Sequence, residues 1–596
     1  MDRGKSKIVN RMNFIFFFFL LFSVFLISKI FYIQNFDSEV EGNNISLETI
    51  KNVEVESSRG NIYSSDGDLI VSTVSKFEIR WDSQVASEKI FQSNKVKLAQ
   101  ELSNLLSEST DYFTDIINNA RKNNNRYLLI AKDLDINQLN ALKTFPMFNL
   151  GIYRGGLIIK ENHLRKSHLG KIAERTIGSF KKGIKEVGLE QAYSQYLGGK
   201  NGVRRMQKIA NGQWKPLKTE YEIEPKEGYD LHTTIDLKIQ EFAHNELLSQ
   251  LEKFEADHGT AIIMETNTGN ILGISNLGIN SEGNYYERLN YAIGEKYEPG
   301  SIFKLMTLIA ALEDGIVKHT DSIDTKNGIY NIRGREIRDS NKKGYGKITI
   351  AKAFEVSSNT AMVRMVHENY KSNPERFVNR LYNMKLNNKI NTPIEGEPNP
   401  RIPYPTDEDW VNTTLPWMAY GYGVSLTPLQ ILTFYNAVAN NGEMVKPKFA
   451  NKISSIGNKP IHEINKEIIM PSICSKKNLD IVKQMLENIV QKPWGTANRI
   501  NDDYIKIAGK TGTSQTDYVK DGDKPINVQY IASFVGYFPS DNPKYTGIVV
   551  IHKPNKSKGY YGGTVAAPVF KRIAQKIQSL SPTIVEINQK DIDNLF

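Results

Sequence analysis

Pro299-Gly300-Ser301-Ile302-Phe303-Lys304 begins a run of mostly apolar residues that continues to Leu312 and stops at Gly315. A helix that is apolar on nearly every side is expected to be buried. Residues three apart share a helix face, so Lys304 is expected beside Ser301. Because burial disfavours an ammonium ion, the pKa of Lys304 should fall, and a neutral lysine can activate a serine. The segment therefore predicts a serine nucleophile, with helix N–H groups available to an oxyanion.

This first motif is weak when taken alone, because Ser-x-x-Lys recurs by chance. The same spacing occurs at Ser179–Lys182 and Ser340–Lys343, where polar and basic neighbours indicate solvated loops. A capping serine followed by a lysine that reaches solvent explains the Ser301 segment equally well.

A second motif, Ser357-Ser358-Asn359, lies between two apolar stretches and is expected to form a short loop between helices. A hydroxyl there could relay a proton to a leaving amine. An asparagine amide could hold a substrate backbone or Lys304. By itself the motif is better explained as a plain polar loop.

The third motif, Lys510-Thr511-Gly512-Thr513, follows the alternating stretch Tyr504–Gly509, which predicts a strand. A lysine and two hydroxyls aimed at one side suit a carboxylate, and Gly512 would let a peptide backbone come close. An acyl-peptide could then lie alongside as an added strand. The alternative is an ordinary edge strand with a glycine bulge. The order and spacing of all three motifs together indicate a serine acyl-transfer enzyme.

The N-terminus predicts a membrane anchor. Residues 1–12 are basic, and residues 13–33 are mostly apolar, which matches the ~20 residues that span a bilayer. No small-residue cleavage site follows, which favours an uncleaved anchor over a signal peptide. The positive flank places the N-terminus in the cytoplasm and the rest of the chain outside.

Composition excludes several other classes of protein. The 596 residues carry a net charge of +10 that is spread along the chain, without an arginine-rich stripe, so nucleic acid is not an expected partner. The single cysteine, Cys474, rules out an internal disulfide. The nine histidines show no metal-binding motif such as HExxH, so neither a metal nor another cofactor is expected.

Local patterns also predict several elements. Residues 83–145 are expected to be helical, with leucines at helical spacing, and Leu237–Phe254 predicts another helix. The short apolar runs Gly259–Met264 and Ile271–Ile274 flank a polar turn and predict a β-hairpin.

The three motifs resemble those of penicillin-binding proteins and serine β-lactamases. Four further segments are similar to class B penicillin-binding proteins, the monofunctional D,D-transpeptidases of bacterial wall synthesis. They are Arg59–Tyr63 with Asp66-Gly67, Gly188–Glu190 with Leu197–Gly202, Thr233–Asp236 with Gln240, and Tyr420–Gly423 with Thr427–Gln430. The resemblance extends over about residues 55–570. The middle motif reads Ser-Ser-Asn where the β-lactamase form is Ser-Asp-Asn.

This resemblance implies a single N-terminal transmembrane helix, an α+β pedestal domain of the dimerisation type, and a mixed α/β transpeptidase domain. The last is β-lactamase/transpeptidase-like, an antiparallel sheet flanked by helices. The expected parts are a cytoplasmic tail at 1–12, the transmembrane helix at 13–33, the pedestal at 34–232, the catalytic domain at 233–580 and a C-terminal tail at 581–596.

The resemblance also implies roles for the motif residues. Ser301 would attack the penultimate D-Ala carbonyl of a stem peptide and form an acyl-enzyme, with Lys304 as the base. Ser357 and Asn359 would handle protons and place the substrate. An amine from a neighbouring stem peptide would then accept the acyl group, and β-lactams would be trapped at Ser301.

The third motif would bind the substrate. Lys510, Thr511 and Thr513 would hold its carboxylate, and Gly512 completes the substrate-binding strand. The backbone N–H groups of Ser301 and Thr513 would form the oxyanion hole.

Among the branches of the family, Arg175–Gly178 ahead of Gly188–Glu190 looks more like the septal-division type than the elongation type. That implies a catalytic domain on the periplasmic, extracytoplasmic side of the inner (cytoplasmic) membrane. The implied partners are a membrane-embedded glycosyltransferase of the shape, elongation, division and sporulation family and other division proteins.

The alternatives are an elongation-type transpeptidase, a membrane-anchored serine β-lactamase and a β-lactam sensor. An anchor plus a large pedestal suits a diffusing hydrolase poorly, and a sensor would need more membrane spans or a cytoplasmic effector.

Overall fold

The computed structural model describes residues 3–36, 50–180, 183–209, 213–216, 223–455, 457–516, 519–521, 524–526 and 528–580. The expected C-terminal tail, 581–596, and residues 37–49 near the start of the expected pedestal lie outside the described residues. The chain divides into two compact units. One comprises Met1–Ser57 with Lys200–Lys226, and the other Ser58–Gly199 with Glu227–Phe596.

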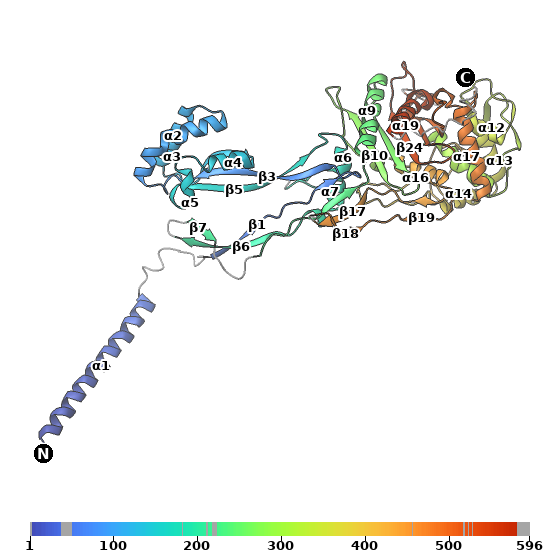
Figure 1. Ribbon diagram of the computed structural model, residues 1–596. Helices are drawn as coiled ribbons and strands as arrows, with labels where there is room; N and C mark the ends of the chain where they lie inside the picture. The colour runs from blue at the N-terminus through green and yellow to red at the C-terminus, as the bar shows by residue number, and fades with distance from the viewer. Residues whose placement is uncertain are drawn as a thin grey trace, which may run out of the picture. The chain divides into compact units, whose positions relative to one another are not determined.

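The first unit contains the apolar helix α1, Arg3–Phe36 (Figure 1). Its segment Met12–Phe31 has a mean hydropathy of 2.6, is not buried, and fits a membrane span by length and composition. The same unit holds an antiparallel sheet in which β6, Gly202–Ile209, pairs with both β1, Ile50–Val55, and β7, Gln213–Pro216.

The second unit begins with the strands and helices of the predicted α+β pedestal. The strand β3, Leu69–Trp81, pairs antiparallel with both β4, Leu128–Leu134, and β5, Leu157–Ser167. The helices packed with them are α2, Glu88–Leu106, α3, Thr110–Lys122, and α4, Ile136–Leu142. The prediction that residues 83–145 are helical throughout is wrong at β4. Pairing with β3, a contact distant in sequence, determines the conformation of this leucine-rich segment.

The pedestal strands β3, β4 and β5 belong to a larger sheet that also contains strands from the catalytic half of the chain. Its order is β18-β17-β8-β2-β3-β4, with β5 also paired to β3. The strands not yet given are β2, Ile62–Tyr63, β8, Asp230–Thr233, β17, Ala450–Ser455, and β18, Lys459–Glu463. The pair β2 and β8 is parallel, whereas the others are antiparallel.

A buried ionic cluster ties together the two pedestal segments that carry the family resemblance. Glu190 receives Arg59 Nε on one carboxylate oxygen and Arg165 Nε on the other, each at 2.7 Å. The Glu190 side chain is fully buried. Arg59 also reaches Glu186 at 3.0 Å. Breaking such a buried network leaves charge without a partner, so the cluster fixes how these segments meet.

The catalytic half is built on a six-stranded antiparallel sheet of order β11-β10-β9-β24-β23-β20. Its strands are β9, His258–Glu265, β10, Ile271–Ile279, β11, Tyr285–Tyr286, β20, Ala508–Thr516, β23, Gln529–Phe538, and β24, Tyr545–His552. The predicted hairpin is confirmed as β9 and β10. The helix predicted over Leu237–Phe254 is confirmed as α9, with the Asp236 carboxylate capping its first turn.

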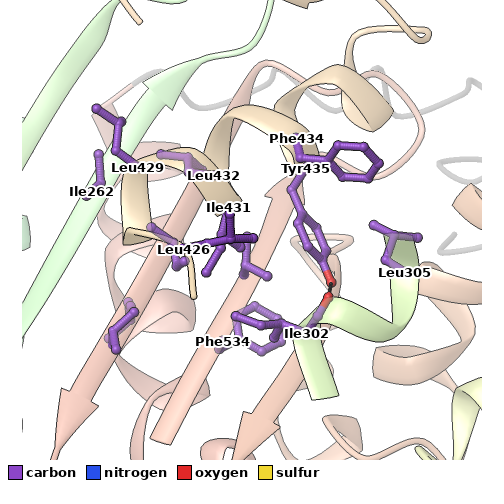
Figure 2. Packing of buried hydrophobic residues seen from close by; sticks show 14 of the residues in the cluster. Ile262, Ile302, Leu305, Leu426, Leu429, Ile431, Leu432, Phe434, Tyr435 and Phe534 are labelled. Carbon is purple, nitrogen blue, oxygen red and sulfur yellow. Dashed lines mark hydrogen bonds between the residues drawn. The ribbon is translucent and has the colours of Figure 1, made fainter. Parts of the chain in front are cut away.

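Helices cover both faces of this sheet, which confirms the predicted fold class (Figure 1). On one face lie α9 and α19, Ala567–Leu580; on the other lies α16, Pro428–Ala439. Figure 2 shows α16 side chains packed beside the start of the Ser301 helix, where the Tyr435 hydroxyl donates a hydrogen bond of 2.8 Å to the Ile302 carbonyl. Full burial of a side chain such as Ile431 is worth about 1.5–3 kcal/mol, so this layer holds the Ser301 segment firmly against the sheet.

The remaining elements are short or surround the site. The helices are α5, Gly151–Arg154, α6, Glu174–Ile177, α7, Gly188–Ala192, α8, Ser194–Leu197, α10, Tyr291–Gly294, α11, Lys304–Glu313, α12, Ile350–Glu355, α13, Asn359–Tyr370, α14, Pro374–Asn383, α15, Thr414–Met418, α17, Lys476–Gln491, and α18, Gly562–Val565. The strands are β12, Ser322–Asp324, β13, Ile329–Ile332, β14, Arg335–Arg338, β15, Lys347–Thr349, β16, Met444–Val445, β19, Ile468–Met470, β21, Val519–Asp521, and β22, Lys524–Ile526.

Candidate active site

Ser301 lies in a single 3₁₀ turn, Gly300–Phe303, that runs directly into the buried helix α11. The glycine before it has φ +56° and donates its N–H to the Gly421 carbonyl at 3.1 Å. A side chain at Gly421 would meet the Gly300 carbonyl oxygen at 2.1 Å. The Tyr420–Gly423 segment is therefore pressed against the start of the Ser301 turn, which requires glycine at this contact.

Lys304 reaches across to the second motif. Its Nζ donates to the Ser357 carbonyl at 2.8 Å, the Ser357 hydroxyl at 3.2 Å and the Asn359 side-chain oxygen at 2.6 Å. The side chain is fully buried, and all three acceptors are neutral oxygens. Burial lowers the pKa of Lys304 to about 7, although the negative charge of Asp339 opposes the shift. A large fraction of Lys304 is therefore neutral at physiological pH.

The second motif forms the predicted loop between two helices, α12 and α13. Ser357 has φ +57°, an uncommon conformation for a residue with a side chain. Ser358 caps α13 by accepting the Ala361 N–H at 3.1 Å. Strained backbone of this kind persists only where its surroundings hold it.

Asp339 holds the residues that follow Ser357, and no motif in the sequence pointed to it. Its buried carboxylate accepts hydrogen bonds from the Ser358 hydroxyl at 3.0 Å, from the Thr360 N–H at 2.9 Å and from the Thr360 hydroxyl at 2.9 Å. Next to it, the Arg338 carbonyl accepts the Asn359 amide at 2.8 Å. Arg338 and Asp339, at the end of β14, thus position Ser358 and Asn359 of the second motif.

The third motif lies on the edge strand β20, but two details differ from expectation. The strand begins at Ala508, because the Asp502 carboxylate accepts the N–H groups of Tyr504 and Ile505 and folds that stretch into a turn. Neighbouring strand residues also point to opposite faces. Thr511 and Thr513 therefore share one face, and Lys510 does not share it.

Lys510 instead joins the buried side of the site. Its Nζ donates to the Ser357 hydroxyl at 2.9 Å, so Ser357 lies between Lys304 and Lys510. Burial holds the pKa of Lys510 well below its usual value, and the charge of Lys304 lowers it further. The three motifs, widely separated in sequence, meet at one hydroxyl.

These residues surround a cavity of about 500 Å³. The predicted residues that line it are Ser301, Ser357, Asn359, Thr511 and Thr513. Lys304 and Lys510 are buried behind this lining and contact it through Ser357. Such a size suits a peptide-like ligand.

Gly512 has a packing role that differs from the expected one. A side chain there would meet the Ser533 hydroxyl at 2.2 Å and the Ile302 side chain at 3.0 Å. The space beside Gly512 is thus filled by the protein itself. The glycine lets β20 lie against both β23 and the Ser301 turn.

Several cavity residues were not predicted. They are Arg338, Asp339, Ser340, Thr496, Arg499, Gln515, Tyr530, Tyr560, Tyr561, Gly562, Gly563 and Thr564. The rings of Tyr530 and Tyr560 are stacked, with their centroids 4.1 Å apart, and line one side of the cavity. The Thr496 and Thr511 hydroxyls are hydrogen-bonded at 2.7 Å. The run Tyr560–Gly563 is visible in the sequence, but nothing local places it in the site.

Comparisons with known proteins agree with this geometry. Residues 259–575 match the family described as the penicillin-binding protein transpeptidase domain, and residues 54–233 match the penicillin-binding protein dimerisation domain. The chain therefore belongs to the penicillin-binding proteins that carry a transpeptidase domain. This confirms the resemblance drawn from its motifs.

Curated relatives span most of the chain. It is 26% identical over 571 residues to peptidoglycan D,D-transpeptidase FtsI of Buchnera aphidicola subsp. Schizaphis graminum, covering 94% of this chain and 92% of that protein. It is 24% identical to FtsI of Escherichia coli K12, with 93% and 89% covered. Stage V sporulation protein D of Bacillus subtilis is 28% identical over 70% of this chain and 64% of its own length.

Solved structures share the fold. Penicillin Binding Protein 2X from Streptococcus thermophilus superposes with a TM-score of 0.75 at 20% identity, covering 89% of this chain and 80% of that one.

Proposed function

We propose that this protein is a D,D-transpeptidase that cross-links peptidoglycan stem peptides through an acyl-enzyme on Ser301. The observation that carries the proposal is the position of Lys304, three residues after Ser301 at the start of the same helical segment. Its buried amine touches Ser357, and burial brings its pKa to about 7. The relatives FtsI are named peptidoglycan D,D-transpeptidases, and their names describe this chemistry.

In the first half-reaction, Ser301 Oγ attacks the carbonyl carbon of the penultimate D-Ala while neutral Lys304 takes the hydroxyl proton. The backbone N–H groups of Ser301 and Thr513 would stabilise the resulting oxyanion. Collapse breaks the peptide bond and releases the terminal D-Ala. Ser357 relays a proton from Lys304 to the leaving amine, because it contacts both Lys304 and Lys510.

In the second half-reaction, the amine of a neighbouring stem peptide attacks the acyl-enzyme. The amine loses a proton along the same relay, a new amide bond forms, and the Ser301 hydroxyl is restored. Thr511 and Thr513 line the cavity and would bind the carboxylate of the donor. The charge on Lys510 would add to that attraction whenever Lys510 is protonated.

The location and partners form a further part of the proposal. The apolar helix α1 would anchor the chain in the cytoplasmic membrane, with the N-terminus inside and the catalytic domain outside. We infer a role in septal wall synthesis from the resemblance of the pedestal and from relatives named FtsI. A membrane-embedded glycosyltransferase and other division proteins would be its partners. Depletion should give filaments, and rounded cells would indicate an elongation role instead.

The activity is tested by incubating the full chain in detergent with a synthetic stem pentapeptide and an amine acceptor. Release of D-Ala together with a joined peptide product is expected from the wild type. Ser301→Ala should give neither product. Ser179→Ala provides a matched control, because that exposed serine has the same spacing to a lysine. Release of D-Ala without a joined product would identify a carboxypeptidase and overturn cross-linking.

A further inference from the structure

Three side chains from separate segments converge away from Ser301. His258 begins β9, His552 ends β24, and Glu295 follows α10. The two histidines are directly opposite each other in the paired strands, with their rings stacked at 4.1 Å. Glu295 Oε2 lies 2.8 Å from His258 Nε2 and 3.7 Å from His552 Nε2.

We propose that His258, Glu295 and His552 bind a divalent transition-metal ion of the Zn²⁺ class. Two imidazole nitrogens and one carboxylate oxygen form a ligand set that zinc prefers. Ligand atoms about 2.0–2.1 Å from a tetrahedral ion lie about 3.3 Å apart. The observed 2.8 and 3.7 Å separations bracket this spacing, and all three ligand atoms lie within 4.8 Å of one another.

The surroundings of His258 are those of a metal-binding histidine. Its other ring nitrogen, Nδ1, lies 2.7 Å from the Asp257 carboxylate. A carboxylate that accepts the Nδ1–H fixes the ring and leaves Nε2 free to bind a metal. Here Nε2 faces Glu295. Nε2 and the Glu295 carboxylate are thus already in contact, and the stacked rings of His258 and His552, whose planes differ by 23°, must tilt for both nitrogens to face one ion.

The cluster is both buried and accessible. His258 and His552 are only 8% and 6% exposed. Together with Glu295 they line a cavity of about 370 Å³. Three protein ligands leave one position of a tetrahedral ion open, and a water from this cavity can occupy it. The cavity also contains Lys296 and Lys553, whose positive charges reduce the affinity for a cation. Because these charges repel a cation, we expect a dissociation constant for Zn²⁺ in the micromolar range or weaker.

A bound ion would connect the central sheet to the segment that leads into the nucleophile. Tyr297 N–H donates to the Leu426 carbonyl at 3.0 Å, and Glu298 accepts the Gly423 N–H at 2.8 Å. The ion would tie β9 and β24 to this segment through Glu295. We therefore expect Zn²⁺ to raise the melting temperature of the protein.

The experiment uses the full chain in detergent, stripped of metal with a chelator and titrated with Zn²⁺ by calorimetry. One ion per chain is expected. His552→Ala and Glu295→Gln should each weaken binding by at least about 100-fold, and Asp257→Asn by about 10–100-fold. His462→Ala, a change at an exposed histidine, is the matched control and should bind as the wild type does. Co²⁺ in the wild-type site should show the intense visible bands of a tetrahedral ion.

Penicillin labelling of Ser301 reports whether each variant is folded. If His552→Ala fails this check, Glu295→Gln, which keeps the side-chain shape, serves as the test. The Co²⁺ spectrum of the wild type is a readout that depends on no variant and no activity. Absence of stoichiometric Zn²⁺ binding by the wild type would overturn the proposal. Equal affinity in Glu295→Gln and His462→Ala would overturn it as well.

Discussion

Two buried clusters of charged side chains lie in the same unit of the molecule and are built in opposite ways. In the pedestal, the Glu190 carboxylate lies between Arg59 and Arg165, with each oxygen 2.7 Å from a guanidinium nitrogen. In the catalytic domain, Lys304 and Lys510 are equally buried but are hydrogen-bonded to Ser357 and other neutral oxygens.

The difference shows how burial can serve structure or chemistry. A buried charge with an opposite partner stays charged and holds its neighbours in place. A buried lysine without such a partner reduces its charge by losing a proton, which makes it a base. The choice of side chain agrees, since arginine remains charged in proteins and lysine shifts its pKa readily.

The largest expected effect comes from removing the proposed base, Lys304. Lys304→Ala should reduce the rate of acylation by penicillin about 10²–10⁴-fold. The variant should remain folded, because no buried carboxylate contacts Lys304 among the described residues and none loses its partner. Stopped-flow acylation and near-ultraviolet circular dichroism measure the two properties. A variant that acylates at the wild-type rate would remove Lys304 from the mechanism.

The mirror experiment removes the pedestal carboxylate. Glu190→Ala leaves the buried Arg165 guanidinium without its ion-pair partner and leaves Arg59 with Glu186 alone, so the free energy of unfolding should fall by about 3–5 kcal/mol. Penicillin acylation per folded molecule should be unchanged. Urea unfolding measures the loss. Asp480→Ala, which breaks the exposed pair with Lys476, is the control and should cost at most about 1 kcal/mol.

The pH dependence of acylation sharpens the same contrast. In the proposed mechanism Lys304 acts when neutral, and burial lowers its pKa to about 7. Below that pH the neutral fraction falls about tenfold per unit, so the acylation rate should fall equally, and it should level off above pH 7. A rate that is constant between pH 5 and pH 8 would contradict the assignment.

Glu287 offers a third case, a buried carboxyl whose oxygens accept the backbone N–H groups of Arg175 and Asn276. Burial raises the pKa of Glu287 to about 8, against an ordinary 4.5. Its contribution to stability is therefore fully present below pH 4.5 and is lost as the pH rises through 8. The free energy of unfolding should fall by about 1 kcal/mol per pH unit in this range. Urea unfolding at several pH values measures it, and Glu287→Gln should remove the slope.

Local patterns in the sequence predicted a good part of the fold. The apolar run after Ser301, the helix over Leu237–Phe254 and the hairpin that follows depend on neighbours in sequence, and the structure has all three. The strand β4 was missed because its pairing with β3 lies about 50 residues away. Lys510 points away from Thr511 and Thr513 because neighbouring residues of a strand face opposite sides. This direction was missed because the lysine and both threonines were expected on one side of the strand.

The site was predictable only in part. Three short motifs indicated which segments carry the chemistry, although the roles of their residues remain predictions. Asp339, Tyr530 and Tyr560 had no such signal, because only the packing of distant segments brings them to the cavity. The same holds for His258, Glu295 and His552, which share no spacing motif and meet through strand register.

The central claim is that Ser301 is the acylated nucleophile, and intact-mass spectrometry after incubation with penicillin tests it most directly. The full chain should gain the mass of one β-lactam, stable for minutes, on a peptide that contains Ser301. Ser301→Ala should gain nothing, and Ser179→Ala should label as the wild type does. An adduct that decays within seconds would indicate a β-lactamase. An adduct that persists in Ser301→Ala, or no adduct on the wild type, would contradict the account.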